Sequence, residues 1–161
     1  MSNTAFTIRQ ATAEDAESIA EFNRLMAFET EHKKLIPEVI LTGVKTMIAN
    51  PSHGFYLVAE KEGEIAGSLM ITTEWSDWRN GVVWWVQSVY VRNEYRRQGI
   101  YRGLYEEVKS LSSSDESVCG YRLYVEKDNV RAQKTYESLG MIETDYLMYE
   151  ELREGLRYCE D

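Results

Sequence analysis

Cysteine and histidine are scarce in this chain of 161 residues, which has two of each. Cys119 and Cys159 are too few for a disulfide framework, and neither lies in a metal-ligand motif. Cys119 lies in an apolar run that predicts a core position. The sequence therefore predicts no metal site. The N-terminus lacks the basic-then-apolar pattern of a secretion signal, so we expect a cytoplasmic protein.

Positive charge and long apolar runs are also in short supply. Lysine and arginine number 18 against 27 acidic residues, which gives a net charge of −9. This balance disfavours nonspecific binding to nucleic acid. No apolar run is long enough to cross a bilayer, so we expect neither nucleic acid nor a membrane as a partner. An acidic surface usually serves solubility, but it also favours cationic substrates.

What the chain does have is enough apolar material for a core. Hydrophobic residues make up 43% of it, which argues against disorder. A chain of this length typically forms one domain, which we expect over residues 1–161. Such a domain buries roughly 70% of the surface that its unfolded chain exposes.

Apolar spacing and turn signals predict six strands and four helices. The strands are expected at residues 5–11, 54–59, 65–73, 82–91, 118–125 and 142–150. The helices are expected to begin at the Thr12–Asp15 capping box, at Pro37, at Ile100 and at Asn129. Asn80-Gly81 indicates a hairpin turn. A short terminal helix at 151–158 is left open.

A basic turn between a strand and a helix is the most informative stretch. The β-rich run to Val91 is followed by Arg96, Arg97 and Gly99, and then by apolar residues at helical spacing. The first amides of a helix lack intrahelical acceptors, and the helix dipole adds positive potential there. We therefore expect a phosphate or pyrophosphate ligand. Neither the P-loop pattern nor the dinucleotide fingerprint is present.

Two motifs resemble those of one superfamily. Arg96-x-x-Gly99-x-Tyr101 resembles motif A of the GNAT superfamily, the acyl-CoA-dependent N-acetyltransferases, although Tyr101 stands where glycine or alanine is usual. The segment 129–141 resembles motif B of the same family through Asn129, Ala132, Tyr136, Gly140 and Met141. Both motifs in this order are more specific than either alone, and the resemblance covers residues 5–150. The segment 74–97 is also similar, more loosely, to diamine and polyamine acetyltransferases.

The resemblance implies an α/β (α+β) fold of the GNAT type. This fold is a mixed, mostly antiparallel sheet of six or seven strands with helices on both faces. Its element order is β-αα-βββ-α-β-α-β, which the predicted elements of this chain follow. The chain after Gly140 is short, so a seventh strand would be absent or merged with the sixth.

The resemblance also implies acetyl-CoA as cosubstrate. In the family, the strand before motif A splays from its neighbour and its backbone holds the pantetheine arm, a role that Val89 and Val91 would take here. The pyrophosphate would lie among Arg96, Arg97, Gln98, Gly99, Tyr101 and Arg102. Asn129 is included with these cofactor-binding candidates, and as a residue it also suits a helix N-cap.

Acetylation of an amine requires loss of a proton from the ammonium and stabilisation of the departing thiolate. Tyr136 occupies the family's general-acid position, and the alternative is a core aromatic on the face of Ala132. Some polyamine-acetylating relatives have a glutamate where this chain has Gln87, which cannot accept a proton and would only orient substrate or water. Glu74 and Asp77 are candidates for binding a cationic amine or relaying a proton, or they belong to a solvated loop.

These observations support three hypotheses. The first is an N-acetyltransferase that acts on a small cationic amine by direct transfer in a ternary complex, since neither motif contains cysteine. The second is a protein or peptide N-acetyltransferase, and the third is a CoA-binding module without turnover. Four tryptophans near the Asn80 turn would line an ammonium pocket, the core or a dimer surface. A homodimer is left open.

Overall fold

A five-stranded sheet forms the centre of the molecule, and the computed structural model describes it within residues 5–161. The strands lie side by side in chain order. They are β1 (Thr7–Gln10), β2 (Phe55–Lys61), β3 (Glu64–Ser76), β4 (Gly81–Val91) and β5 (Val118–Arg122). Neighbouring strands from β1 to β4 are antiparallel, whereas β5 runs parallel to β4.

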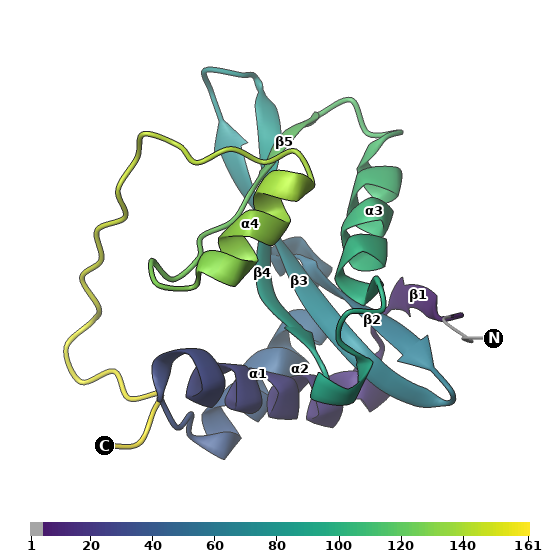
Figure 1. Ribbon diagram of the computed structural model, residues 1–161. Helices are drawn as coiled ribbons and strands as arrows, with labels where there is room; N and C mark the ends of the chain where they lie inside the picture. The colour runs from purple at the N-terminus through teal and green to yellow at the C-terminus, as the bar shows by residue number, and fades with distance from the viewer. Residues whose placement is uncertain (1–4) are drawn as a thin grey trace.

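In the described part of the chain, four helices flank the sheet (Figure 1). They are α1 (Ala16–Glu31), α2 (Pro37–Ala49), α3 (Ile100–Ser112) and α4 (Val130–Ser138). Short 3-10 turns are η1 (Ala13–Asp15), η2 (Pro51–His53) and η3 (Asn93–Tyr95). No helix among the described residues is long and apolar enough to cross a membrane.

The core has two halves, one on each face of the sheet. On one face α1 and α2 cover β2 through a cluster that includes Ile19, Val44 and Val58. On the other face, α3 inserts Leu104 and Val108, which have no exposed surface. Burial of side chains of this size stabilises the fold by about 1.5–3 kcal/mol each. The mixed α/β fold with helices on both faces is therefore confirmed.

Several local predictions from sequence are also confirmed. The Thr12 amide donates to the Asp15 carboxylate at 2.7 Å, as the capping box requires. Pro37 is the first residue of α2. Asn80 has a φ of 49° in the turn between β3 and β4, which is the left-handed conformation that asparagine tolerates.

The predicted sixth strand at 142–150 is wrong for the single chain. Within the described residues this segment pairs with no strand, although its residues alternate as a strand would. A strand needs a neighbour for its backbone hydrogen bonds, and the segment leaves the sheet instead. The sheet therefore has five strands among residues 5–161 and not six or seven. No helix forms at 151–158 either, because Gly155 has a φ of 83°, which is incompatible with a helix.

Two further expectations at β5 are wrong. The strand ends at Arg122 and not at Val125, because its partner β4 diverges after Trp85 and no ladder remains. Cys119 is exposed and not in the core. The reason is its place on an edge strand next to Gly81, where the β4–β5 register shifts.

Candidate active site

Strands β4 and β5 pair over a short distance and then separate. Their last paired residues are Trp85 and Arg122, but β4 continues to Val91. No described strand adjoins β4 on the β5 side beyond Trp85. A strand edge of this kind presents unpaired backbone groups to an extended ligand. Val89 and Val91, which the sequence placed in this role, both lie on this free part of β4.

A bulge in β4 lies at the start of the free edge. Ser68 pairs with Tyr90 and Met70 with Gln87, so Ser88 and Val89 together oppose the one residue between Ser68 and Met70. Ser88 has a φ of 52°, which costs about 1–3 kcal/mol for a residue other than glycine. Bulges re-aim backbone groups beside active sites. The sequence missed this feature because serine gives no signal for positive φ.

The motif A loop, residues 92–99, joins β4 to α3 and exposes a set of amides. Arg97 and Gly99 both have positive φ, at 64° and 81°. The first intrahelical bond of α3 runs from the Gly103 amide to the Gly99 carbonyl at 2.9 Å. The amides of residues 99–102 have no backbone acceptor within residues 5–161. Together with the helix dipole, they form the anion site that the sequence predicted.

The arginines of this loop have different environments. Arg96 binds Glu29 on α1 at 3.0 Å and the Val91 carbonyl at 2.9 Å, with its guanidinium 5.3 Å from the ring of Tyr90. Its charge is therefore engaged within the protein and ties the loop to α1. Arg102 is exposed, and neither it nor Arg97 forms an ion pair among residues 5–161.

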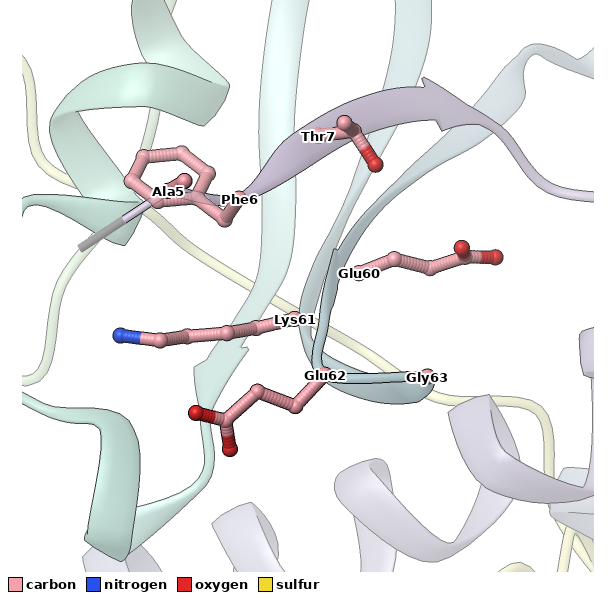
Figure 2. A pocket seen from close by; sticks show the side chains of 7 residues that line it. All are labelled: Ala5, Phe6, Thr7, Glu60, Lys61, Glu62 and Gly63. Carbon is pink, nitrogen blue, oxygen red and sulfur yellow. The ribbon is translucent and has the colours of Figure 1, made fainter. Parts of the chain in front are cut away.

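Lys61 contacts the motif A loop through Gln98, a role that was not predicted from the sequence. Its side chain is almost fully buried, its ammonium donates to the Gln98 side chain, and it lies 5.8 Å from the ring of Tyr95. Figure 2 shows Lys61 at a cavity of about 230 Å³, extending to the same side as Phe6 and away from Glu60. No motif predicts this contact, because Lys61 and Gln98 are distant in sequence.

Helix α4 places Tyr136 against the beginning of α3. Asn129 caps α4 by accepting from the Ala132 amide at 3.1 Å, and Gly140 ends it with a φ of 100°. The ring of Tyr136 meets that of Tyr101 edge-on, with centroids 5.6 Å apart. Tyr136 is half-buried, and this burial raises the pKa of its hydroxyl. The hydroxyl is therefore protonated at neutral pH and available as an acid.

Tyr101, which stands where motif A usually has glycine or alanine, packs against Tyr136. Its hydroxyl is buried without a hydrogen-bond partner in the described part of the chain. Burial, and then the neighbouring Tyr136 and Tyr105, raise the pKa of this hydroxyl. The ring of Tyr101 stacks on that of Tyr105, with the two ring centroids 6.3 Å apart. Tyr101 thus supports the ring of Tyr136, a role that the motif pattern does not contain.

A row of polar side chains crosses β3, β4 and β5. The Gln87 amide donates to Thr72 at 2.6 Å. Two residues after Thr72 on β3, Glu74 accepts from the Trp85 indole at 3.1 Å and from the Arg122 guanidinium at 2.6 Å. Gln87 and Glu74 thus belong to one row that starts beside the Ser88 bulge. The charge of Glu74 is balanced by Arg122.

Asp77 lies outside this row. It is exposed in the turn of the β3–β4 hairpin, where its carbonyl accepts from the Asn80 amide. The Ser76–Gly81 pair lies six residue steps along the strands from the Met70–Gln87 pair, which is roughly 20 Å at about 3.3 Å per step. The structure does not bring Asp77 and Gln87 together.

Residues 14–141 match the model of the acetyltransferase (GNAT) family. The chain belongs to this family. A solved structure described as a possible acetyltransferase from Clostridium difficile 630 has 46% identity, covers 92% of this chain and 97% of its own, and has a TM-score of 0.85. The comparison with curated proteins gave no match.

Two more distant structures share the fold of this acetyltransferase. A predicted acetyltransferase from Clostridium acetobutylicum, solved with acetyl-CoA, has 16% identity and a TM-score of 0.74, and covers 91% of this chain and 96% of its own. Glucosamine-6-phosphate N-acetyltransferase from Arabidopsis thaliana has 19% identity and a TM-score of 0.69, and covers 92% and 99%.

This GNAT protein is an acetyl-CoA-dependent acetyltransferase, and its residues fit that cosubstrate. Four amides at the beginning of α3 are without backbone acceptors among residues 5–161, as a pyrophosphate site requires. A Cβ built on Gly99 would meet no protein atom within 4 Å, so the space beside the loop is open. Asn129 has a structural task as the cap of α4.

Proposed function

We propose that this acetyltransferase moves the acetyl group of acetyl-CoA directly to the primary amine of a small cationic molecule. The observation that carries the proposal is the position of Tyr136. Its protonated hydroxyl belongs to a ring packed on Tyr101 in the first turn of α3, the helix that follows the free part of β4 in the chain. An acid placed there is suited to the thiolate that leaves when the amine attacks the thioester.

The cosubstrate is proposed to lie along the free edge of β4. Val89 and Val91 would bind the pantetheine through their backbones. The amides of Gly99, Tyr101 and Arg102 would hold the pyrophosphate, with added charge from Arg97. The Gln98 side chain, engaged by Lys61, would fix the loop in this conformation. Arg96 would contribute indirectly, because its guanidinium binds Glu29.

The acceptor amine is proposed to approach along the polar row. The Gln87 side chain uses its NH₂ group on Thr72, which leaves its oxygen as an acceptor for an amine N–H. Because an amide cannot take a proton, the ammonium would lose its proton to water. Glu74 lies further along the row and would contact a second cationic group of the acceptor in competition with Arg122. Asp77 would act only on an acceptor long enough to reach the hairpin turn.

Direct transfer follows from the same residues. Attack by a neutral amine on the thioester carbonyl forms the amide bond, breaks the carbon–sulfur bond and releases the second amine proton to water. The thiolate then takes the proton of Tyr136, which is restored from solvent. Both cysteines lie outside the proposed site, Cys119 on β5 and Cys159 near the C-terminus, so no acetyl-enzyme is needed.

Release of thiol from acetyl-CoA tests the proposal with a panel of acceptors. The panel includes diamines, polyamines, amino sugars and peptides with free N-termini. We expect turnover with a small amine, and Gln87→Ala to raise KM for that amine while leaving acetyl-CoA affinity unchanged. Thr72→Val is the matched control, since it removes the partner of Gln87 but not the proposed contact. Turnover with peptides alone would identify a protein N-acetyltransferase, and binding without any turnover a CoA-binding module.

A further inference from the structure

The segment after α4 is an extended arm that exposes large apolar side chains. We call residues 142–152 the C-terminal arm. Four of its side chains, those of Ile142, Tyr146, Leu147 and Tyr149, are 72–90% exposed, and Met148 is 60% exposed. Figure 1 shows the arm running outside the body of the molecule, from α4 back towards α1 and α2. An apolar surface of this size normally marks a contact site.

The arm is fixed at both ends. At its start, the Met141 amide donates to the Tyr136 carbonyl at 3.1 Å, and Met141 packs on the core beneath α3. Beyond its end, the Ile36 amide donates to the Tyr158 carbonyl at 2.9 Å, and Leu35 bridges to Cys159. Between these anchors, the backbone of residues 142–152 makes no hydrogen bond to another backbone group of residues 5–161.

The sheet has a matching free edge at β5. Strand β5 is last in the order and pairs with β4 on one side only. Its other side pairs with no strand of residues 5–161, so its backbone groups are a template for a further strand. Ile142, Thr144 and Tyr146 alternate with Glu143 and Asp145, as in a strand with one buried face, and residues 146–149 are apolar on both faces.

We propose that the arm of one copy pairs with β5 of a second copy, and that the exchange is reciprocal. Among residues 5–161, each copy offers the outer side of β5 and one unpaired strand-like arm, so a twofold dimer satisfies both copies and closes. The sixth strand that the sequence predicts at 142–150 then forms between chains.

The charge of the arm and the surface area that it would bury are consistent with a second copy of the chain as its binding partner. Residues 142–151 carry four acidic and no basic residues, whereas residues 122–134, which run from the end of β5 into α4, carry four basic and two acidic residues. The arm is therefore net acidic and the segment that follows β5 is net basic, which favours their association. Burial of four large side chains per copy, at roughly 150 Å² each, removes about 1,200 Å² from water, which is within the range of stable interfaces.

Proline substitutions test the pairing of the arm. Successive amides of a strand point to opposite sides, so either Thr144→Pro or Asp145→Pro must delete a donor to β5. Light scattering is expected to give twice 18.7 kDa for the wild type. One of the two proline variants should weaken the dimer by about 10-fold or more, because the loss occurs twice. Thr144→Ala and Asp145→Ala keep the amides and should remain dimers. Acetyl-CoA binding confirms that each variant is folded.

Mixed disulfides test which chain the arm meets. One protein keeps the native, exposed Cys119 on β5 and carries Cys159→Ser. The other lacks both native cysteines and carries one cysteine at a position from 144 to 148. Oxidation of the mixture should link one copy of each protein at one or more of these positions, which neither protein alone can do. A wild type of 18.7 kDa at high micromolar concentration, a dimer unaffected by both prolines, or no mixed product at any position would overturn the proposal.

Discussion

The hydroxyl of Tyr136 is the atom on which the proposed chemistry depends. Tyr136→Phe keeps the ring that packs on Tyr101. We expect kcat to fall by roughly 10- to 1,000-fold, with acetyl-CoA affinity and Tm nearly unchanged. Burial raises the pKa of Tyr136 above its ordinary value of 10, so the wild-type rate should fall only above pH 10 as the acid ionises. The variant should lack this alkaline limb.

Steady-state kinetics across pH measures both effects. A near-normal kcat in the folded variant would reduce Tyr136 to a packing residue. The thiolate would then leave unprotonated or take its proton from water.

Removal of the Tyr101 hydroxyl and removal of the Tyr121 hydroxyl should have different effects on the free energy of unfolding. That of Tyr101 is buried without a partner among residues 5–161, whereas that of Tyr121 contacts the Ser112 hydroxyl at 2.5 Å. Because an unpaired buried hydroxyl costs roughly 1–3 kcal/mol, Tyr101→Phe should leave the free energy of unfolding unchanged or raise it. Tyr121→Phe should lower it by about 1 kcal/mol. Denaturant unfolding compares the two, and a clear loss in Tyr101→Phe would reveal a bound water or other partner.

At the scale of elements, the motif A loop is expected to bind through its backbone. Gly99 has a φ of 81°, so Gly99→Val forces a β-branched residue into a conformation that it resists and moves the amides at the beginning of α3. We expect acetyl-CoA affinity to fall by about 10-fold or more. Arg97→Ala removes one exposed charge and should weaken binding only a few-fold. Calorimetry without acceptor measures both, and an Arg97 effect larger than the Gly99 effect would contradict backbone binding.

The junction of β1, β2 and α1 has a pH-dependent link. Arg9 binds the buried Asp15 at 2.8 and 2.9 Å and also pairs with Glu60. The guanidinium of Arg9 lowers the pKa of Asp15 below its usual 3.8. A lowered folded-state pKa means that this stability is present above pH 3.8 and is lost as the pH falls through the folded value.

Asp15→Asn should therefore cost about 1–3 kcal/mol of unfolding free energy at neutral pH. Its stability should also depend less on pH below 4 than that of the wild type. Urea unfolding at a series of pH values measures both. Equal slopes in acid for the two proteins would show that Asp15 is not the linked group.

For the whole molecule, the proposed cosubstrate site predicts stabilisation by ligand. Acetyl-CoA at 100 times its Kd should add about 2.7 kcal/mol to the free energy of unfolding. For a chain of this size, that raises Tm by roughly 5–10 °C. Free CoA should act similarly, because the proposed phosphate contacts do not involve the acetyl group. If millimolar acetyl-CoA left the Tm of thermal unfolding unchanged, that result would contradict the proposed site.

The sequence alone determined those features of the protein that depend on local rules. Period and capping predicted α1 to α4. The signals at Pro37, Asn129 and Gly140 located the ends of α2 and α4, and Asn80 located the β3–β4 turn, because each suits one backbone conformation. Motif spacing led to the family and to acetyl-CoA. These features depend on neighbours within a few residues, so they are visible in the chain itself.

Only the tertiary structure decided which distant residues meet. It joined Lys61 to Gln98 and Arg96 to Glu29, separated Asp77 from Gln87, and placed the ring of Tyr101 beside that of Tyr136. Within residues 5–161, it also left the strand-like arm without a partner in its own sheet. Alternation shows that a segment can be a strand, but a strand exists only where another edge supplies its hydrogen bonds, and the position of that edge is set by how the whole chain folds.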